Sequence, residues 1–221
     1  DSPSWSLGCE QLFYFLFPFL ALLFAKKQKL IGALLVCAVV VPVLMSMTDE
    51  ANIRGYWYVN PLARFPDFLV GMLLYRVYEW CRSKKLSFFT ASLLEVGAVC
   101  IFLLFYMISA DLVPKVYRYS CYYWMPISLV LLIFSLQKGF LSRILSNKYL
   151  VIGGDISYSF YLIHLWILFA YVQLAQTYDW HISLYISIPL IFAVTIGLSL
   201  LSYYYFEKPA NRWVKRILNK Q

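Results

Sequence analysis

The sequence predicts an all-α, polytopic transmembrane helix bundle, and three observations support this fold class. Of the 221 residues, 62% are hydrophobic and only 14% are charged, whereas soluble domains contain about 25% charged and about 45–50% apolar residues. The apolar residues form runs close to the ~20 residues that a helix needs to cross a bilayer. Lys and Arg gather in short clusters between these runs, as in the loops of membrane proteins. The formal net charge of +8 therefore does not indicate a nucleic acid partner.

The apolar runs predict about seven membrane-spanning helices in one domain of residues 1–221. The expected spans are residues 10–25, 30–47, 62–80, 88–110, 121–137, 156–177 and 183–206. The connector at about residues 138–152 mixes apolar and cationic side chains, which favours a helix lying along the membrane interface. Pro209 follows the last run and is expected to end that helix.

The distribution of positive charge predicts which ends of the spans face the cytoplasm. One set of alternate connectors, together with the tail, holds fourteen Lys and Arg residues, whereas the opposite set holds four. Cytoplasmic loops are enriched in Lys and Arg, so we expect a cytoplasmic C-terminus and an exterior start of the first span. The chain begins with Asp1 and no signal peptide precedes the first run, so we expect it to be the later part of a longer protein.

The cysteines and the missing nucleotide motifs narrow the possible chemistry. The five cysteines are scattered and form no CxxC pair, so we expect neither a disulfide framework nor a metal site. The sequence contains no G-x-x-x-x-G-K-[ST], G-x-G-x-x-G, G-x-S-x-G or HExxH pattern. Nucleotide hydrolysis, dinucleotide chemistry and zinc catalysis therefore have no support, and we expect no tightly bound cofactor.

Glu10 is the candidate catalytic residue, at the start of the first span. With Phe13, Tyr14 and Phe17 it follows the i, i+3, i+4, i+7 spacing of one helix stripe. A carboxylate in a membrane helix is costly unless it faces protein or a water-filled cavity, so its presence predicts a functional site. The alternative is a structural role, in which the carboxylate interacts with the positive end of the helix dipole.

Arg64 and Asp67 lie at the start of the third expected span, on the same exterior side as Glu10. Ionisable side chains at a membrane edge are rare and need partners, so these three residues are predicted to form one site at the mouth of the bundle. Asp67 follows Pro66, and the alternative is that it only interacts with the helix dipole in the first turn.

The sixth expected span carries a second candidate group. Ser157, Tyr161 and His164 are spaced i, i+4, i+7 on one face. His164 is either a proton relay or a hydrogen-bonding partner of a neighbouring helix. Glu95 stands alone in the apolar fourth span and is expected to pair with another helix. His181 lies in an exterior turn and is expected to be solvated.

Four stretches of the chain resemble motifs of the membrane-bound acyltransferase 3 family of bacterial cell-surface acyltransferases. They are Ser4-Trp5-Ser6-Leu7 with Glu10, Phe13-Tyr14 and Pro18; Arg64 to Gly71, which reads RFPDFLVG; Gly153 to His164, with the runs ISYS and YLIH; and Tyr203 to Arg212, with Glu207-Lys208-Pro209. Each motif is weak alone, but their order on membrane helices is specific, and together they cover nearly the whole chain. The chain departs from the family pattern at Gly8-Cys9 and Gln11-Leu12.

The resemblance implies an acyl-CoA-dependent O-acyltransferase, often using acetyl-CoA, that modifies sugar hydroxyls of a cell-envelope or exported polysaccharide. It also implies a location in the bacterial cytoplasmic (inner) membrane. The lipid bilayer, a glycan acceptor and the acyl-CoA donor are the expected partners. The family's proposed catalytic histidine lies on a first helix that this chain does not contain, so His164 is not assigned that role.

The same resemblance suggests roles for the candidate residues. Glu10 is expected to orient the family's histidine or to support it as a proton acceptor. Trp5 and Tyr14 are expected to stack on the sugar, and Arg64 is expected to hold an anionic group. The other expected substrate-binding residues are Ser6, Asp67, Tyr161 and His164.

The sequence also allows two other classes of protein. A transporter or flippase for a lipid-linked sugar would also use intramembrane charges and aromatic side chains. Such a protein usually contains repeated halves with broken helices, which the sequence does not show. The second alternative is a structural relative that does not bind the donor. Transfer of label from acyl-CoA to a glycan would distinguish the enzyme from the transporter, and a histidine on the missing first helix would distinguish it from the structural relative.

Overall fold

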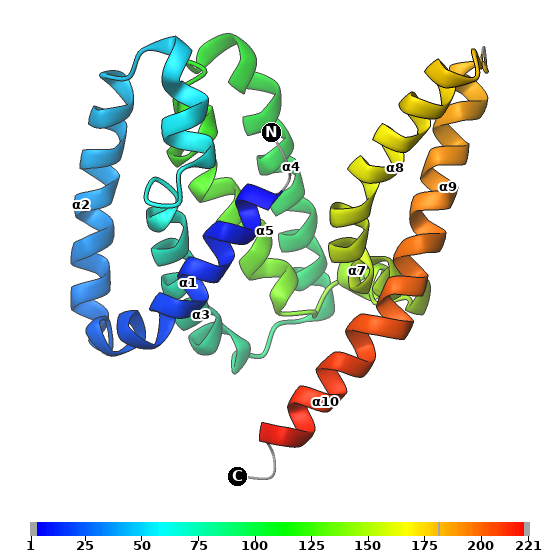
Figure 1. The fold of residues 1–221 in the computed structure, drawn as a ribbon. Coiled ribbons are helices and arrows are strands. Elements are labelled where there is room, and N and C mark those ends of the chain that lie inside the picture. The colour runs from blue at the N-terminus through cyan, green and yellow to red at the C-terminus, as the bar shows by residue number, and fades with distance from the viewer. Residues whose placement is uncertain (1–3, 181, 219–221) are drawn as a thin grey trace. The chain divides into compact units, whose positions relative to one another are not determined.

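The computed structural model describes residues 4–180 and 182–218, and helices make up nearly all of them (Figure 1). No strand occurs in these two ranges, so the predicted all-α fold class is confirmed. The chain divides into two compact units, Asp1–Leu145 and Ser146–Gln221, which we call the N-terminal unit and the C-terminal unit. The assignment of residues 1–221 to one domain stays a prediction.

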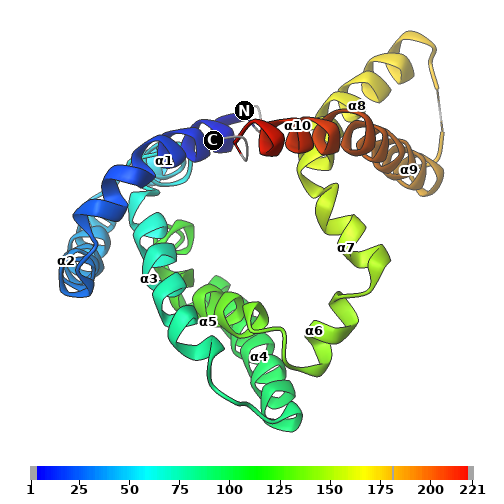
Figure 2. The same cartoon turned by 90° about the horizontal axis from the view of Figure 1, so that it is seen from below.

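The N-terminal unit is built from long helices joined by short helical turns. Its helices are α1 (Ser4–Leu23), α2 (Lys27–Ser46), α3 (Phe65–Arg82), α4 (Phe88–Leu112), α5 (Trp124–Ser135) and α6 (Phe140–Leu145). The turns are η1 (Glu50–Asn52), η2 (Arg54–Val59), η3 (Tyr117–Tyr119) and η4 (Cys121–Tyr123). α5 lies between α3 and α4 and contacts both (Figure 2).

Five helices among the described residues are long and apolar enough to cross a membrane, as expected of a multi-pass membrane protein. They are Trp5–Leu23, Lys27–Ser46, Phe88–Leu112, Ser157–Thr177 and Leu184–Ile217. Two of the seven expected spans do not meet this standard. α3 is 18 residues long but contains four charged side chains. α5 has 12 residues, or about 18 Å of helix, because η4 forms a separate turn before it.

The first three helices of the N-terminal unit associate through one apolar cluster. Leu20 of α1, Leu30 of α2 and Leu69 of α3 are buried against one another, together with Phe24, which directly follows α1. Close packing of side chains stabilises helix pairs even where the surroundings are lipid. The cluster therefore holds the end of α1 and the start of α2 against α3.

Hydrogen bonds show that the basic connectors of the N-terminal unit meet at one end. Arg76 of α3 donates to the carbonyl oxygens of Phe24, at 2.7 Å, and Ala25, at 3.1 Å. The turn between α1 and α2 therefore lies beside the last part of α3. Lys26, Lys27 and Lys29 occupy this turn.

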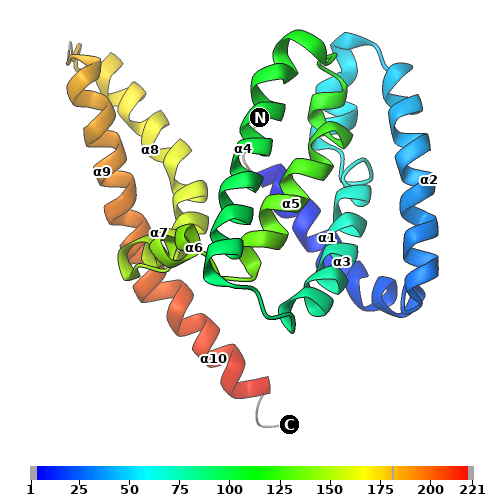
Figure 3. The same cartoon turned by 180° about the vertical axis from the view of Figure 1, so that it is seen from behind.

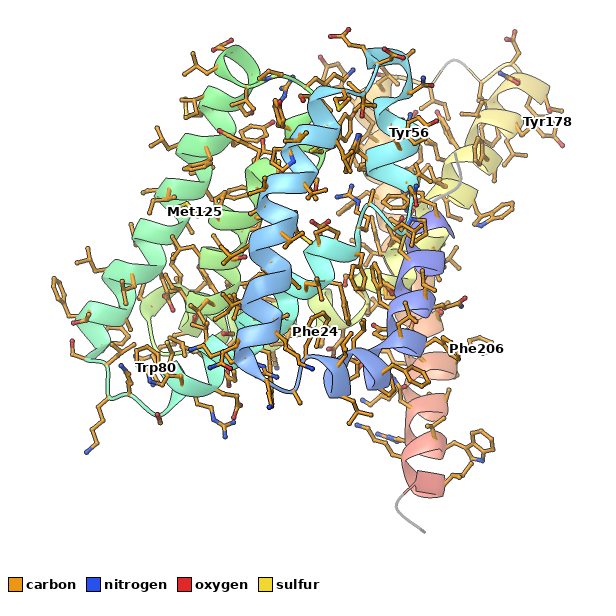
Figure 4. The ribbon with its side chains drawn as sticks, turned by 90° about the vertical axis from the view of Figure 1, so that its left-hand side faces the viewer. Phe24, Tyr56, Trp80, Met125, Tyr178 and Phe206 are labelled. Carbon is orange, nitrogen blue, oxygen red and sulfur yellow. The ribbon has the colours of Figure 1, made fainter. Side chains whose placement is uncertain are left out.

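The connector between α3 and α4 lies close to the segment that follows α5. The Lys138 ammonium donates to the carbonyl oxygens of Arg82, at 3.0 Å, and Lys84, at 2.7 Å. We call this end of the unit the basic end. Figure 4 shows Phe24 and Trp80 toward it and Tyr56 toward the opposite end. Within this unit, alternate connectors thus share an end, as the charge pattern predicts.

Glu95 joins α4 to α6 through a buried carboxylate. Its side chain is 1% exposed and accepts backbone hydrogen bonds from Gly139 (3.0 Å), Leu141 (2.8 Å) and Ser142 (3.2 Å), and one from the Ser142 hydroxyl. The first N–H groups of a helix have no partner within the helix, and a carboxylate is well suited to them. The expectation that Glu95 pairs with another helix is confirmed.

The C-terminal unit is an antiparallel helix pair with a long extension. It contains α7 (Lys148–Asp155), α8 (Ser157–Thr177), α9 (Leu184–Ser202), the π-helical turn η5 (Tyr203–Glu207) and α10 (Lys208–Leu218). α8 and α9 pack against each other (Figure 3), and the hydroxyls of Tyr171 and Ser187 are hydrogen-bonded at 2.5 Å. The connector at residues 138–152 is largely helical, and its position at a membrane interface stays a prediction.

The prediction that Pro209 ends the last helix is wrong. α9 continues through η5 into α10, and Pro209 is the second residue of α10. Proline lacks an N–H donor but is tolerated in the first turn of a helix, where that donor has no partner in the helix. The wider turn of η5 directly before Pro209 creates such a start, so the helix continues past the proline.

Candidate functional site

Arg64 and Asp67 form the centre of a polar network at the start of α3. An Arg64 Nη1 donates to Asp67 Oδ2 at 3.1 Å, and the indole N–H of Trp124 donates to Asp67 Oδ1. Trp124 is the first residue of α5. Of the three residues predicted to share one site, Arg64 and Asp67 are therefore in contact, and the Trp124 contact fixes the start of α3 to the start of α5.

The Arg64 guanidinium also connects α3 to two loop segments. Its Nε donates to the Tyr58 carbonyl oxygen at 3.1 Å, and its Nη1 donates to the Tyr119 carbonyl oxygen at 2.8 Å. The guanidinium carbon lies 5.2 Å from the centre of the Tyr58 ring, a distance typical of a cation–π interaction. Arg64 therefore holds η2 and η3 beside α3, which leaves less of its donor capacity for a ligand.

A cavity of about 420 Å³ opens beside this network, between α3 and α5. We call it the α3–α5 cavity. Its lining residues are Arg64, Asp67, Val70, Gly71 and Leu74 from α3 and its start, Arg118, Tyr119, Ser120 and Tyr123 from the η3–η4 segment, and Trp124, Ile127, Ser128 and Leu131 from α5. The cavity combines an ion pair, tyrosines and an apolar wall, so it is a candidate ligand site.

Arg118 is a residue that the sequence analysis missed, because it was counted only as a loop charge. It lines the α3–α5 cavity and also an adjoining cavity of about 460 Å³, together with Tyr119 and Tyr123. Its position between Tyr117 and Tyr119 in the sequence was the signal available, since a cation among aromatics beside a span is a common arrangement for polar ligands.

The start of α1 packs against the same loop that Arg64 holds. The Trp5 ring lies 4.7 Å from the Tyr58 ring, centre to centre, and the Cys9 thiol lies 3.9 Å from the Val59 carbonyl oxygen. Ser6 is half-buried beside them. The structure therefore brings Trp5 close to Arg64 through Tyr58.

Glu10 and Tyr14 point away from this network. Glu10 is exposed and Tyr14 is 72% exposed, and neither lines the α3–α5 cavity. Phe13 and Phe17 instead contact Phe68 of α3, with ring centres 4.9 and 6.3 Å apart. The predicted stripe is thus divided, because adjacent positions on a helix differ by about 100° around its axis. The roles of Glu10 and Tyr14 stay predictions.

The alternative role of Glu10 as a helix-start residue does not fit the structure. α1 begins at Ser4, and its first turn contains no acidic side chain. The favourable effect of the helix dipole on a carboxylate falls off within the first turn. Glu10 lies beyond that turn, so the helix dipole does not explain its presence.

Tyr161 and His164 lie in the C-terminal unit and are half-buried on α8. Their ring centres are 5.9 Å apart, and the His164 ring stacks on Phe160 at 6.0 Å. His164 Nδ1 lies 3.2 Å from the Phe160 carbonyl oxygen, so this nitrogen bonds within its own helix. Ser157 is exposed, and His181 lies outside the described residues.

Two of the motifs that carry the family resemblance meet directly in the C-terminal unit. The Ser159 hydroxyl of the ISYS run donates to the Glu207 carboxylate and lies 3.0 Å from the Ser202 hydroxyl. The Tyr203 hydroxyl donates to Asp155 Oδ2 at 2.9 Å. Residues more than forty positions apart therefore fix α8 to the end of α9 and to η5, and fix α7 to η5, which is a structural role for both motifs.

The described residues hold no group of three His, Cys, Asp or Glu side chains placed to bind a metal ion. The five cysteines are free.

The fold and these sites define a multi-pass, all-α membrane protein with polar and aromatic side chains at the ends of its helices. A family model described as an acyltransferase domain, Acyl_transf_3, matches residues 1–204. The chain belongs to this family and is an enzyme that transfers acyl groups. The match extends over both compact units. Comparisons with curated proteins and with solved structures gave no match.

Proposed function

We propose that this acyltransferase moves an acyl group, acetyl in the simplest case, from acyl-CoA to a sugar hydroxyl of a cell-envelope or exported polysaccharide. The observation that carries the proposal is the family match over residues 1–204 of a multi-pass membrane protein. A membrane-spanning enzyme can receive a donor on one side of the bilayer and an acceptor on the other.

The proposed reaction needs a base, a sugar hydroxyl and a thioester. The base removes the hydroxyl proton while the oxygen attacks the thioester carbonyl carbon. The new C–O bond forms and the C–S bond breaks, so that coenzyme A leaves as a thiol after taking up the proton. This acyl transfer balances without a metal, an oxidant or a bound cofactor.

We assign Glu10 to this proton transfer, as the group that orients the base or accepts the proton from it. The support is its position on α1, where it is exposed and no described residue gives it a hydrogen bond or an ion pair. A carboxylate facing hydrocarbon would be costly, and a polar substrate or a water-filled space beside α1 would remove that cost. Tyr14 is exposed one turn further along and would meet the same ligand.

The proposed orientation puts the basic end of the N-terminal unit in the cytoplasm of a bacterium, with the protein in the cytoplasmic membrane and the C-terminus inside. The support is the asymmetry of the Lys and Arg residues between the connectors. In this orientation, Arg64 and Asp67 lie toward the exterior, where an exported glycan would be reached.

The direct test uses membranes that contain the full-length protein, a glycan acceptor and acetyl-CoA labelled in its acetyl group. We expect label to appear in the glycan and coenzyme A to be released in equal amount. A transporter or flippase would move the glycan without incorporating label. Release of coenzyme A without label in any glycan would contradict the proposed acceptor class.

A further inference from the structure

The α3–α5 cavity contains two buried polar atoms that no described residue satisfies. Arg118 Nε and Ser120 Oγ are inaccessible to solvent and have no hydrogen-bond partner, and Ser120 is 5% exposed. Both residues line the cavity. Leaving a buried polar group unpaired is unfavourable, and buried polar atoms in proteins nearly always have a partner. These two atoms therefore indicate a ligand that accepts hydrogen bonds.

The charge around these atoms favours an anion. Arg64 and Asp67 neutralise each other in an ion pair of 3.1 Å, whereas Arg118 forms no ion pair with a described residue. Lys115 lines the adjoining cavity, which shares Arg118. Within the part of the chain that the structure describes, Arg118 thus gives the α3–α5 cavity an uncompensated positive charge, and Lys115 adds a second cation in the adjoining cavity. An excess of positive charge attracts an anion.

The other end of the cavity is apolar. On α3, the lining residues after Arg64 and Asp67 are Val70, Gly71 and Leu74, at the spacing of successive turns on one helix face. Leu74 lies about 15 Å beyond Arg64 along the helix axis, at 1.5 Å per residue.

α5 contributes the facing wall of this apolar end. Ile127 and Leu131 line it, and both side chains are exposed, at 43% and 56%. The cavity therefore changes from cationic at the helix ends to hydrocarbon-like between the two helices.

We propose that the α3–α5 cavity binds an anionic amphiphile with a phosphate-type head and a hydrocarbon chain. The head accepts charge-assisted hydrogen bonds from Arg118 and a hydrogen bond from Ser120, and the chain lies between α3 and α5. A phospholipid of the bilayer and a single-chain lipid phosphate share this chemistry. The site is a binding site, and its existence does not depend on the proposed acyl transfer.

The test uses the full-length protein in nanodiscs of neutral phosphatidylcholine and a photoactivatable dodecyl phosphate as the probe. We expect saturable labelling of peptides from α3 and α5, measured by mass spectrometry. Arg118→Gln should weaken binding at least about tenfold, because a charge-assisted hydrogen bond exceeds the 1.4 kcal/mol that a tenfold change represents. Lys27→Gln removes an exposed cation at the basic end and should leave labelling unchanged.

A second variant tests the chain rather than the head. Gly71 lines the apolar part of the cavity, and nothing lies within 4 Å of a Cβ atom built there. Gly71→Leu should therefore fold normally and fill the space for the chain. We expect it to lose dodecyl phosphate while butyl phosphate, which competes at the head alone, binds as it does to the unchanged protein.

Competitors then distinguish the sources of the ligand. Displacement of the probe by phosphatidic acid or by unlabelled dodecyl phosphate would support the site and identify the number of chains it accepts. Displacement by inorganic phosphate at the same concentration as dodecyl phosphate would overturn the proposal, since the chain would then contribute nothing. Labelling that neither Arg118→Gln nor Gly71→Leu reduces would also overturn it.

Discussion

Two arginines near the α3–α5 cavity differ in what surrounds them. Arg64 donates to Asp67 and to the carbonyl oxygens of Tyr58 and Tyr119, so its charge and most of its donors are used within the protein. Arg118 Nε is buried without a partner. The Arg64 guanidinium therefore stabilises the local fold, whereas the Arg118 guanidinium is available to a ligand. The sequence pattern predicts an anion-binding role for Arg64, whereas the contacts favour Arg118 in that role.

Arg64→Ala should destabilise the protein more than an ordinary surface substitution. It removes three hydrogen bonds of a charged group and leaves the Asp67 carboxylate without its cation. We expect the free energy of unfolding to fall by about 2–4 kcal/mol, given about 1.5–3 kcal/mol for a hydrogen bond to a charged group. Unfolding by denaturant in detergent micelles measures this free energy. Lys27→Ala, at an exposed position, should change it by less than about 0.5 kcal/mol.

Gly139→Ala should also destabilise, for a steric reason. A Cβ atom at Gly139 would overlap the buried Glu95 carboxylate, and overpacking a buried site costs about 1–3 kcal/mol. Gly97→Ala is the matched control on α4, because a Cβ atom there meets nothing within 4 Å. The free energy of unfolding of the Gly97→Ala variant should rise by about 0.5–1 kcal/mol, because helices prefer alanine to glycine.

The contact between Glu95 and Gly139 also predicts how substitutions at these two positions affect stability together. In Glu95→Ala the carboxylate is absent, so adding Gly139→Ala should cost less than it does in the unchanged protein. The non-additive part is the coupling free energy of the pair. Fully additive effects of the two substitutions would show that Gly139 and Glu95 do not touch.

At the scale of the elements, the helix pair α8–α9 depends on polar contacts as well as apolar packing. Ser159 contacts Glu207 and Ser202 across the pair. Ser159→Ala should lower the stability of the C-terminal unit by about 1 kcal/mol, the usual net value of a hydrogen bond. Ser157→Ala, at an exposed position two residues earlier and about 200° away around the helix axis, is the control. Equal effects of the two substitutions would exclude a role for the Ser159 contact.

The sequence predicted the elements unequally, and composition explains the difference. Long apolar runs such as α2 and α4 were recognised because length and hydropathy alone identify them. α5 was predicted too long, since the turn η4 is also apolar and aromatic and its hydrogen-bond pattern cannot be read from composition. The sequence predicts a helix end at Pro209, because the wide turn η5 that accommodates the proline has no simple sequence signal.

At the scale of the whole molecule, the charge asymmetry predicts one orientation in the membrane. Lys85→Cys lies in a basic connector and Glu50→Cys lies in the opposite one, and both positions are exposed. In spheroplasts, a membrane-impermeant maleimide should label Glu50→Cys directly and Lys85→Cys only after permeabilisation. The unchanged protein corrects for its own cysteines. The reverse labelling pattern would contradict the cytoplasmic assignment of the basic end.

The sites, unlike the fold, could be predicted only in part. Arg64 and Asp67 lie three residues apart at the start of α3, and their common place at the exterior end of a span was enough to predict that they share a site. Trp124, Tyr58 and Arg118 reach the same place from distant parts of the chain, and spacing along one helix gives no information about such contacts. The partners of Glu95 were unknown for the same reason, since α6 lies more than forty residues away.

The most direct measurement of the central claim is acyl transfer by the full-length Glu10→Gln variant. The substitution keeps the size of the side chain and removes its negative charge and its ability to accept a proton. We predict that transfer from labelled acetyl-CoA to the glycan is lost while the protein reaches the membrane in normal amount, and that Glu50→Gln, which removes another exposed carboxylate, transfers normally. Full transfer by Glu10→Gln would contradict the assignment of this carboxylate to the reaction.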